Sequence, residues 1–305
     1  MKFIDILEAK SIFKKGENVT QYLRKKFGNE DNTSEIIEIA YDLQAGSYIR
    51  NVKSNFDNAD NYANELSNIL SNNLEHGDSL LDVGTGEITT LTLVLNKLKT
   101  ELSDVVALDI SWSRLSVGIQ FHQEYRRRKF PLKVFVADIK TIPLHEKCVD
   151  VVTSSHALEP NGRNLESLLL ELFRVTKKKL VLFEPSYELN SKEGKVRMDK
   201  LGYIKDIEGT VSRLGGKVMD VVPIRHTSNP LNPTACYIIE PPKHTGKHLD
   251  VVTFCVPGTN FELKLDEQYF FSKDTGLVFP VLDDIAVLKT SSAILATSKI
   301  DLYLD

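Results

Sequence analysis

Five short aliphatic runs along residues 79–186 constrain the fold more than any other feature of this 305-residue chain. An aliphatic run without polar alternation is typical of a strand buried on both faces, which indicates a parallel sheet covered by helices. Because amphipathic stretches separate the runs, the pattern predicts a doubly wound α/β domain. The runs are SLLDVGTG (79–86), VVALDIS (105–111), KVFVADI (133–139), VDVVTSS (149–155) and KKLVLFEPS (178–186).

The same reading extends to helices and to two further strands. Helices are expected over residues 89–98, 112–127, 165–175 and 199–214, and further strands at KVMDVVPIRH (217–226) and ACYIIEPP (235–242). Residues 1–76 have helix-like spacing and are predicted to form an N-terminal helical cap or lid. The sheet domain is placed at 77–242. Pro241 and Pro242 mark its end, and residues 249–305, rich in Phe, Val and turn residues, are expected to form a small β-rich module.

Composition excludes several classes of protein. A 42% hydrophobic and 26% charged chain is not disordered as a whole. The net charge of −4 supplies no general attraction for a phosphate backbone, so a nucleic-acid partner is not expected. No apolar run is long enough for a membrane span, and the acidic residues in the first apolar stretch argue against a signal peptide. Three scattered cysteines fit a reducing cytosol, which predicts a cytoplasmic protein.

The strongest chemical signal is the turn Leu81-Asp82-Val83-Gly84-Thr85-Gly86-Glu87. A buried strand runs into Gly-x-Gly and then a helix, which permits a sharp turn and a ligand against the main chain. Position 89 is Thr, so the third glycine of the dinucleotide fingerprint is missing, which disfavours an NAD oxidoreductase. Asp82 precedes the glycines, Asp109 ends the second strand and Asp138 ends the third. A carboxylate at the second strand end is the group that receives a ribose diol in this architecture.

Taken together, these motifs resemble the class I S-adenosylmethionine-dependent methyltransferases over roughly residues 35–240. LLDVGTGE is similar to their first motif, ALDIS to the ribose-binding acid, and VADIKTIPL to the adenine-contacting segment. VDVVTSSHALE and LVLFEPSYE are similar to the fourth- and fifth-strand motifs. The resemblance implies S-adenosyl-L-methionine as cofactor, S-adenosyl-L-homocysteine as product, and no metal.

Residue roles follow from this resemblance position by position. Asp82, Gly84, Thr85 and Gly86 would pack against the methionine part, Asp109 would hold the ribose, and Ile110, Asp138 and Ile139 would surround the adenine. Ser154 or Ser155 would lie under the sulfonium. Upstream, the resemblance implies that Tyr41 and Tyr48 close over the cofactor and that Arg50 pairs with its carboxylate; the alternative is a helix–loop element with packed tyrosines.

The loops after the fourth and fifth strands are expected to face the transferable methyl group. His156 and Glu159 are candidate general bases for an oxygen or nitrogen nucleophile, with a structural histidine as the alternative. Glu184 and Tyr187 sit on the same rim, either facing substrate or shaping the loop. The basic run 126–129 is the one patch that argues for nucleic acid, but a solvated helix end explains it as well.

The C-terminal segment is similar to the small Trm112-type zinc-ribbon module, through the residues GLVFPVLDDIAVL (276–288). Of four metal cysteines, Cys255 alone remains, and one thiolate does not hold a structural zinc. The segment is therefore predicted to be a metal-free brace or lid.

The leading function is a methyltransferase acting on oxygen or nitrogen of a small molecule or sugar. The alternatives are an RNA or protein methyltransferase and a non-catalytic scaffold that binds the cofactor. The oligomeric state is open, with a homodimer among the options.

Overall fold

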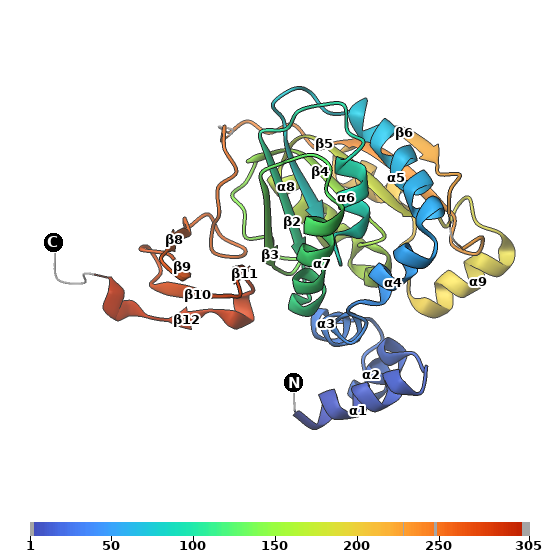
Figure 1. Cartoon of the computed structure of the whole chain (residues 1–305), viewed down its shortest axis with the longest axis horizontal. Coiled ribbons are helices and arrows are strands. Elements are labelled where there is room, and N and C mark those ends of the chain that lie inside the picture. The colour runs from blue at the N-terminus through green and yellow to red at the C-terminus, as the bar shows by residue number, and fades with distance from the viewer. Residues whose placement is uncertain (1–2, 228, 247–248, 301–305) are drawn as a thin grey trace.

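A computed structural model describes residues 3–227, 229–246 and 249–300. Its core is a sheet in the order β6-β7-β5-β4-β1-β2-β3 (Figure 1). Strands β1 to β5 are parallel, and β7 runs antiparallel between β5 and β6. This order confirms the predicted doubly wound, Rossmann-like sheet. The bounds are β1 Ser79–Val83, β2 Asp104–Asp109, β3 Leu132–Val136, β4 Val149–Ser155, β5 Thr176–Pro185, β6 Lys217–Pro223 and β7 Thr234–Glu240.

Helices cover both faces of the sheet because alternate residues of each strand enter two separate apolar cores. In β1, Leu81 and Val83 pack in one core and Leu80 in the other. A third, smaller core joins the N-terminal helices α1 to α3, which lie beside the carboxyl ends of the strands (Figure 1). The helices are α1 Phe3–Lys14, α2 Val19–Phe27, α3 Ser34–Asp42, α4 Ser47–Ser54, α5 Phe56–Ser71, α6 Thr89–Leu95, α7 Trp112–Tyr125, α8 Leu165–Val175, α9 Lys192–Leu201 and α10 Ile207–Arg213.

The expected single helix over residues 199–214 is wrong. Gly202 ends α9 in the left-handed conformation, with φ of +69°. Asp206 then begins α10, and its side chain accepts the Gly209 N–H at 3.1 Å. A glycine C-cap followed by an aspartate N-cap satisfies the backbone groups at both new helix ends, which makes the break favourable.

The C-terminal segment forms an antiparallel strand module that also extends the main sheet. β11 pairs in parallel with β3, through Ala286 with Phe135 and Val287 with Val136. The remaining strands continue outward in the order β10-β9-β8, and β12 pairs with β10. Their bounds are β8 Lys264–Asp266, β9 Tyr269–Phe271, β10 Leu277–Leu282, β11 Ile285–Val287 and β12 Ile294–Leu295.

Apolar packing holds this module against β3. The ring of Phe254 lies 5.3 Å from the ring of Phe135 in an edge arrangement and 5.3 Å from that of Phe270.

Cys255 is buried, and no cluster of three or more His, Cys, Asp or Glu side chains suited to a metal occurs among the described residues. Within the same described ranges, no helix combines the length and apolarity that crossing a bilayer demands.

Strand order reverses at β1, whose neighbours are β2 on one side and β4 on the other. The loops that follow these strands therefore diverge and leave a crevice at their carboxyl ends. Helices α3 and α4 lie next to the carboxyl ends of these strands (Figure 1). The crevice at these strand ends is therefore the candidate functional site.

Candidate active site

The glycine turn after β1 brings the main chain very close to two other segments. Gly84 and Gly86 have φ of +65° and +59°, a region that side chains disfavour. A Cβ on Gly84 would lie 2.4 Å from the Cβ of Ala157, and a Cβ on Gly86 would lie 2.3 Å from a guanidinium nitrogen of Arg114. Backbone conformation therefore favours glycine at both positions, and space adds a firm constraint at Gly84, because the neighbour of Gly86 is the movable end of an arginine side chain.

Asp109 anchors this turn from the end of β2. Its Oδ2 accepts the Gly86 N–H at 2.9 Å, and its Oδ1 accepts the Ser111 N–H at 2.9 Å. At the end of the next strand, Asp138 accepts the Lys140 N–H at 2.9 Å. Both carboxylates are thus oriented by backbone groups rather than by long side chains, which gives two fixed acceptors at the edge of the sheet.

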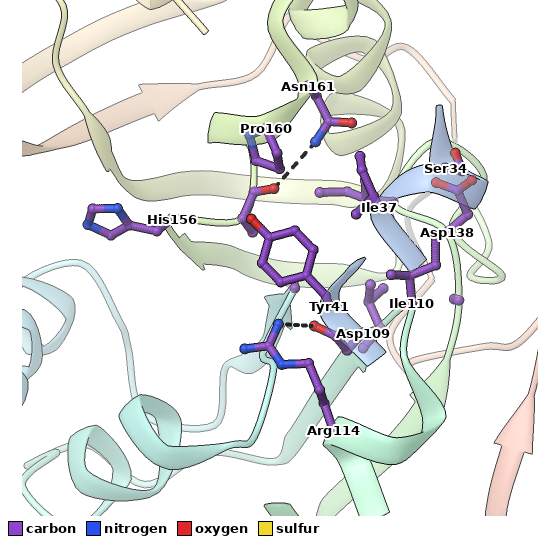
Figure 2. A pocket seen from close by; sticks show the side chains of 15 residues that line it. Ser34, Ile37, Tyr41, Asp109, Ile110, Arg114, Asp138, His156, Pro160 and Asn161 are labelled. Atoms are coloured by element: carbon purple, nitrogen blue, oxygen red, sulfur yellow. Dashed lines mark hydrogen bonds and ion pairs between the residues drawn. The ribbon is translucent and has the colours of Figure 1, made fainter. Parts of the chain in front are cut away.

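Two cavities of about 70 Å³ each lie against the glycine turn. The first is bounded by the strand ends and by α3 (Figure 2), and it is lined among others by Tyr41, Gly84, Asp109, Ile110, Arg114, Asp138, Ile139, His156 and Asn161. The second faces α4 and α5, and it is lined among others by Tyr48, Asp82, Gly84, Thr85, Glu87, Thr89, Arg114, Thr153 and Ser155. Gly84 and Arg114 line both, so the two cavities are halves of one cleft.

The second cavity has an unusual buried carboxyl group. Burial raises the pKa of Asp82 to about 7, and the nearby Asp109 carboxylate adds to the shift. Asp82 is 8% exposed. A hydrogen bond from the Thr85 hydroxyl, in the same lining, opposes this rise. A cationic or hydrogen-bonding ligand group in this half of the cleft would complete the hydrogen bonding of the Asp82 carboxyl group.

Glu87 attaches the N-terminal helices to the glycine turn. Its carboxylate accepts the backbone N–H groups of Gly46 at 2.9 Å, Tyr48 at 3.4 Å and Ile49 at 2.8 Å, at the start of α4. The residue is 1% exposed. Because a helix N-terminus has unpaired N–H groups, this contact stabilises α4 and places Tyr48 over the cleft. The sequence analysis did not assign Glu87, although its place directly after the glycines was a usable signal.

Arg114 is a second residue that sequence reasoning missed. It follows the β2 carboxylate by five positions, on the first turn of α7. Its guanidinium lies 5.3 Å from the ring centre of Tyr41 and 4.6 Å from that of Tyr48. The two tyrosines therefore do lie at the cleft, as expected, and an arginine lies with them.

Three other predicted residues lie outside the cleft. Arg50 is exposed and lines neither cavity. Ser154 is buried and donates its hydroxyl to Glu184 at 2.7 Å, so Ser155 is the serine that lines the second cavity. Tyr187 donates to Asp199 at 3.3 Å and lines neither half of the cleft.

His156 and Glu159 form a pair on the loop after β4. His156 Nδ1 lies 2.9 Å from Glu159 Oε2, and Nε2 lies 2.8 Å from the Thr234 hydroxyl. Burial lowers the pKa of His156, but the hydrogen bond to Glu159 and the charges of Glu159 and Glu184 outweigh it and raise the pKa overall. Asn232 also donates to Glu159, at 3.2 Å. The backbone of His156 has φ of +57°, a strained conformation of the kind that occurs at functional sites.

A larger cavity of about 340 Å³ adjoins this pair. His156 points away from the other labelled side chains of the first cavity (Figure 2) and contributes to the lining of the larger one. Tyr62 reaches in from α5 and lies 2.9 Å from the Ser155 hydroxyl. The other polar lining residues come from α4, α5, α6 and the 226–234 loop, and they are Asn51, Asn55, Asn58, Thr89, Thr90, His226, Thr227, Asn229 and Asn232.

Glu184 shapes the loop that carries this pair. It is fully buried, and its Oε1 accepts the Ser154 hydroxyl at 2.7 Å and the N–H groups of Ala157 at 3.0 Å and Leu158 at 3.1 Å. Its Oε2 is buried without a partner among the described residues. Of the two roles left open by the sequence, the structure places Glu184 in the loop-shaping one.

Comparison with known proteins agrees with this architecture. Residues 81–183, about a third of the chain, match a family model described as a methyltransferase domain. No curated protein sequence matches the chain. A methyltransferase from Methanosarcina mazei is similar to 58% of this chain over 98% of its own, with 15% identity and a TM-score of 0.49.

Two further solved structures are similar to part of the chain at low identity. One is a protein from Galdieria sulphuraria that is described as a putative sarcosine dimethylglycine methyltransferase. The match covers 60% of this chain and 85% of the other chain, with 10% identity and a TM-score of 0.48. A Haloferax volcanii complex between the Trm112 activator and a methyltransferase contains a chain similar to 57% of this one over 86% of its own, with 16% identity and a TM-score of 0.46. The strand order, the glycine turn and the family match over residues 81–183 together support a class I methyltransferase domain.

Proposed function

We propose that this protein is an S-adenosyl-L-methionine-dependent methyltransferase that transfers a methyl group to oxygen or nitrogen of a small polar molecule, such as a sugar. The observation that carries the proposal is the His156–Glu159 pair: His156 lines both the first cavity of the cleft and an adjoining cavity of polar, mostly uncharged side chains, and Glu159 lines the adjoining one. A base placed at that boundary is what proton removal from an acceptor requires.

The polar groups of the cleft, rather than its volume, match the proposed cofactor. Asp109 and Asp138 offer carboxylate oxygens to the ribose and adenine, and Gly84 brings the main chain to the wall of both cavities. The buried Asp82 carboxyl group suits the amino-acid portion. When bound, the cofactor supplies a methyl group activated by the positive sulfur, so the protein must chiefly align an acceptor and take up a proton.

His156 is the proposed general base. In the tautomer that donates Nδ1–H to Glu159, Nε2 carries no proton and accepts a hydrogen bond from the Thr234 hydroxyl. An acceptor hydroxyl in the larger cavity would replace that threonine as the donor to Nε2. Because the pKa of His156 is raised, methyl transfer is expected to increase with pH through a midpoint above the ordinary histidine value of about 6.5.

The lining of the larger cavity supports a neutral acceptor. Among the described residues that line it there is no lysine or arginine, and Glu159 is the one acidic residue. Asparagine, threonine, serine and tyrosine side chains both donate and accept hydrogen bonds, as hydroxyl-rich molecules require. A volume of about 340 Å³ falls at the small end of the range for ligand pockets. These features favour a small polyhydroxylated molecule over a phosphate-bearing one.

The basic run 126–129 adds little support for a nucleic-acid substrate. It follows the end of α7, and the Arg128 guanidinium donates to the Leu98 carbonyl and lies over the Phe130 ring. A segment similar to Trm112 modules does not change this proposal, because β11 already pairs with β3 within the chain and the segment is acidic. We interpret residues 249–300 as a brace of the sheet edge.

Methyl transfer from labelled S-adenosylmethionine to a panel of neutral glycosides, polyols, RNA and protein tests the proposal. His156→Asn is the informative variant, because asparagine tolerates a positive φ and keeps a donor for Glu159 but is no base. We expect a roughly 10²- to 10⁴-fold loss of transfer with cofactor binding retained. His76→Asn, at an exposed position, is the matched control. Label found on RNA or protein, or full activity of His156→Asn, would contradict the proposal.

A further inference from the structure

Arg114 occupies the junction between the two halves of the cofactor cleft. It contributes to the lining of both cavities, and its side chain is 9% exposed. Figure 2 shows it reaching from α7 toward Asp109, below the ring of Tyr41. Because Gly86 has no side chain, the guanidinium lies directly over the glycine turn.

The hydrogen bonding of Arg114 is incomplete. Its Nη1 lies 3.8 Å from Asp109 Oδ2, which is too long for a hydrogen bond. That oxygen already accepts the Gly86 N–H at 2.9 Å. The Arg114 Nε is buried without a partner among the described residues. A guanidinium has five donors, and leaving them unmet in a buried place is costly, so Arg114 is suited to an anionic ligand group.

The charges around the second cavity indicate which group this is. Its lining contains the carboxyl groups of Asp82 and Glu87, and Arg114 is its single cationic side chain. Glu87 is already used by three backbone N–H groups of α4. This leaves one buried acid and one buried cation on the two sides of the glycine turn, an arrangement complementary to the ammonium and carboxylate of an amino acid.

We infer that Arg114 binds the carboxylate of the amino-acid portion of the cofactor, and that it exchanges its long contact with Asp109 for that carboxylate. Asp109 keeps its bonds from the Gly86 and Ser111 N–H groups, and the remaining lone pairs of its carboxylate accept the ribose hydroxyls. The rings of Tyr41 and Tyr48, which both lie against the guanidinium, hold it in place during the exchange. This inference rests on the proposed function, and it replaces the sequence-based assignment of the carboxylate to Arg50.

Calorimetric titration with two ligands tests the inference without any acceptor. S-adenosylhomocysteine has the carboxylate, and its decarboxylated analogue, S-adenosyl-3-thiopropylamine, lacks only that group. In Arg114→Met, binding of S-adenosylhomocysteine should weaken by roughly 10- to 100-fold, while binding of the analogue changes by less than about threefold. Arg114→Lys keeps the charge but not the planar donor fork, and should give an intermediate loss for S-adenosylhomocysteine alone. Thermal melting shows whether each variant is folded.

Arg50→Met is the matched control, and it should bind both ligands as the unmodified protein does. If Arg114→Met weakens the binding of both ligands equally, Arg114 has a structural role and the inference is overturned. If Arg114→Met binds both ligands more tightly, Arg114 only obstructs the cleft, and the inference is overturned as well. Selective loss in Arg50→Met would return the carboxylate to Arg50. If the unmodified protein binds neither ligand, the proposed function itself fails, and the inference fails with it.

Discussion

Replacing Glu184 by glutamine should remove a large part of the pH dependence of stability. Burial raises the pKa of this carboxyl group to about 7 from an ordinary value of 4.5. The folded protein therefore holds the proton over a wider pH range than the unfolded chain does. Between these two pKa values unfolding releases a proton, so the contribution of Glu184 to stability is greatest below pH 4.5 and falls as the pH rises toward 7.

The size of the effect follows from the shift. A carboxyl group with these two pKa values lowers the free energy of unfolding by about 2–3 kcal/mol between pH 5 and pH 8. Glutamine keeps an oxygen for the donors of Ser154, Ala157 and Leu158 and does not ionise. Its amide nitrogen takes the place of the unpaired Oε2, and burying this donor without a partner lowers the free energy of unfolding by about 1–3 kcal/mol. Because this cost is the same at pH 5 and pH 8, it cancels when the two free energies are subtracted.

Urea denaturation followed by circular dichroism at pH 5 and pH 8 measures this difference. The loss of stability on going to pH 8 should be about 2–3 kcal/mol smaller in Glu184→Gln than in the unmodified protein. Glu166→Gln, which removes the same formal charge at an exposed position of α8, is the matched control and should change little. If Glu184→Gln shows the same pH dependence as the unmodified protein, the buried carboxyl group is not protonated in the fold and the reasoning is refuted.

Three further predictions concern the cofactor cleft and the C-terminal segment. Asp109→Asn should weaken S-adenosylhomocysteine binding by roughly 10- to 100-fold in calorimetry, because hydrogen bonds to a charged group are lost; an unchanged affinity would remove this carboxylate from the site. Gly84→Ala should lower the free energy of unfolding in urea by about 1–3 kcal/mol more than Gly16→Ala does. Both glycines have positive φ, but Gly84 alone meets a neighbour, the Ala157 Cβ at 2.4 Å, so equal losses would contradict the steric argument. Phe254→Ala should cost about 1–3 kcal/mol in the same assay, because its ring packs between rings of β3 and β9; no loss would show that the segment is not a brace.

Strands buried on both faces and helices with a regular apolar spacing were predictable from the sequence. Strands buried on both faces require uninterrupted aliphatic residues, so β1 to β5 were readable as runs, and α8 was expected at its observed bounds. The acid at each strand end was readable for the same reason, since parallel strands end at one edge. The break between α9 and α10 was missed, because an apolar period of 3.6 outweighed the glycine and aspartate caps in the pattern.

The side chains that complete the site were decided by tertiary contacts. Arg50 lies beside Tyr48 in the sequence, and Arg114 lies more than sixty positions away, yet it is Arg114 that packs on both cleft tyrosines. In the same way Glu184 lies near the end of a predictable strand, β5, but its hydrogen bonds come from N–H groups of the loop that follows the neighbouring strand, β4. Hydrophobic periodicity is a property of one segment and can be read along the chain. The partner of a buried charge is set by which segments the fold brings within a few ångströms, and the order of residues does not contain that information locally.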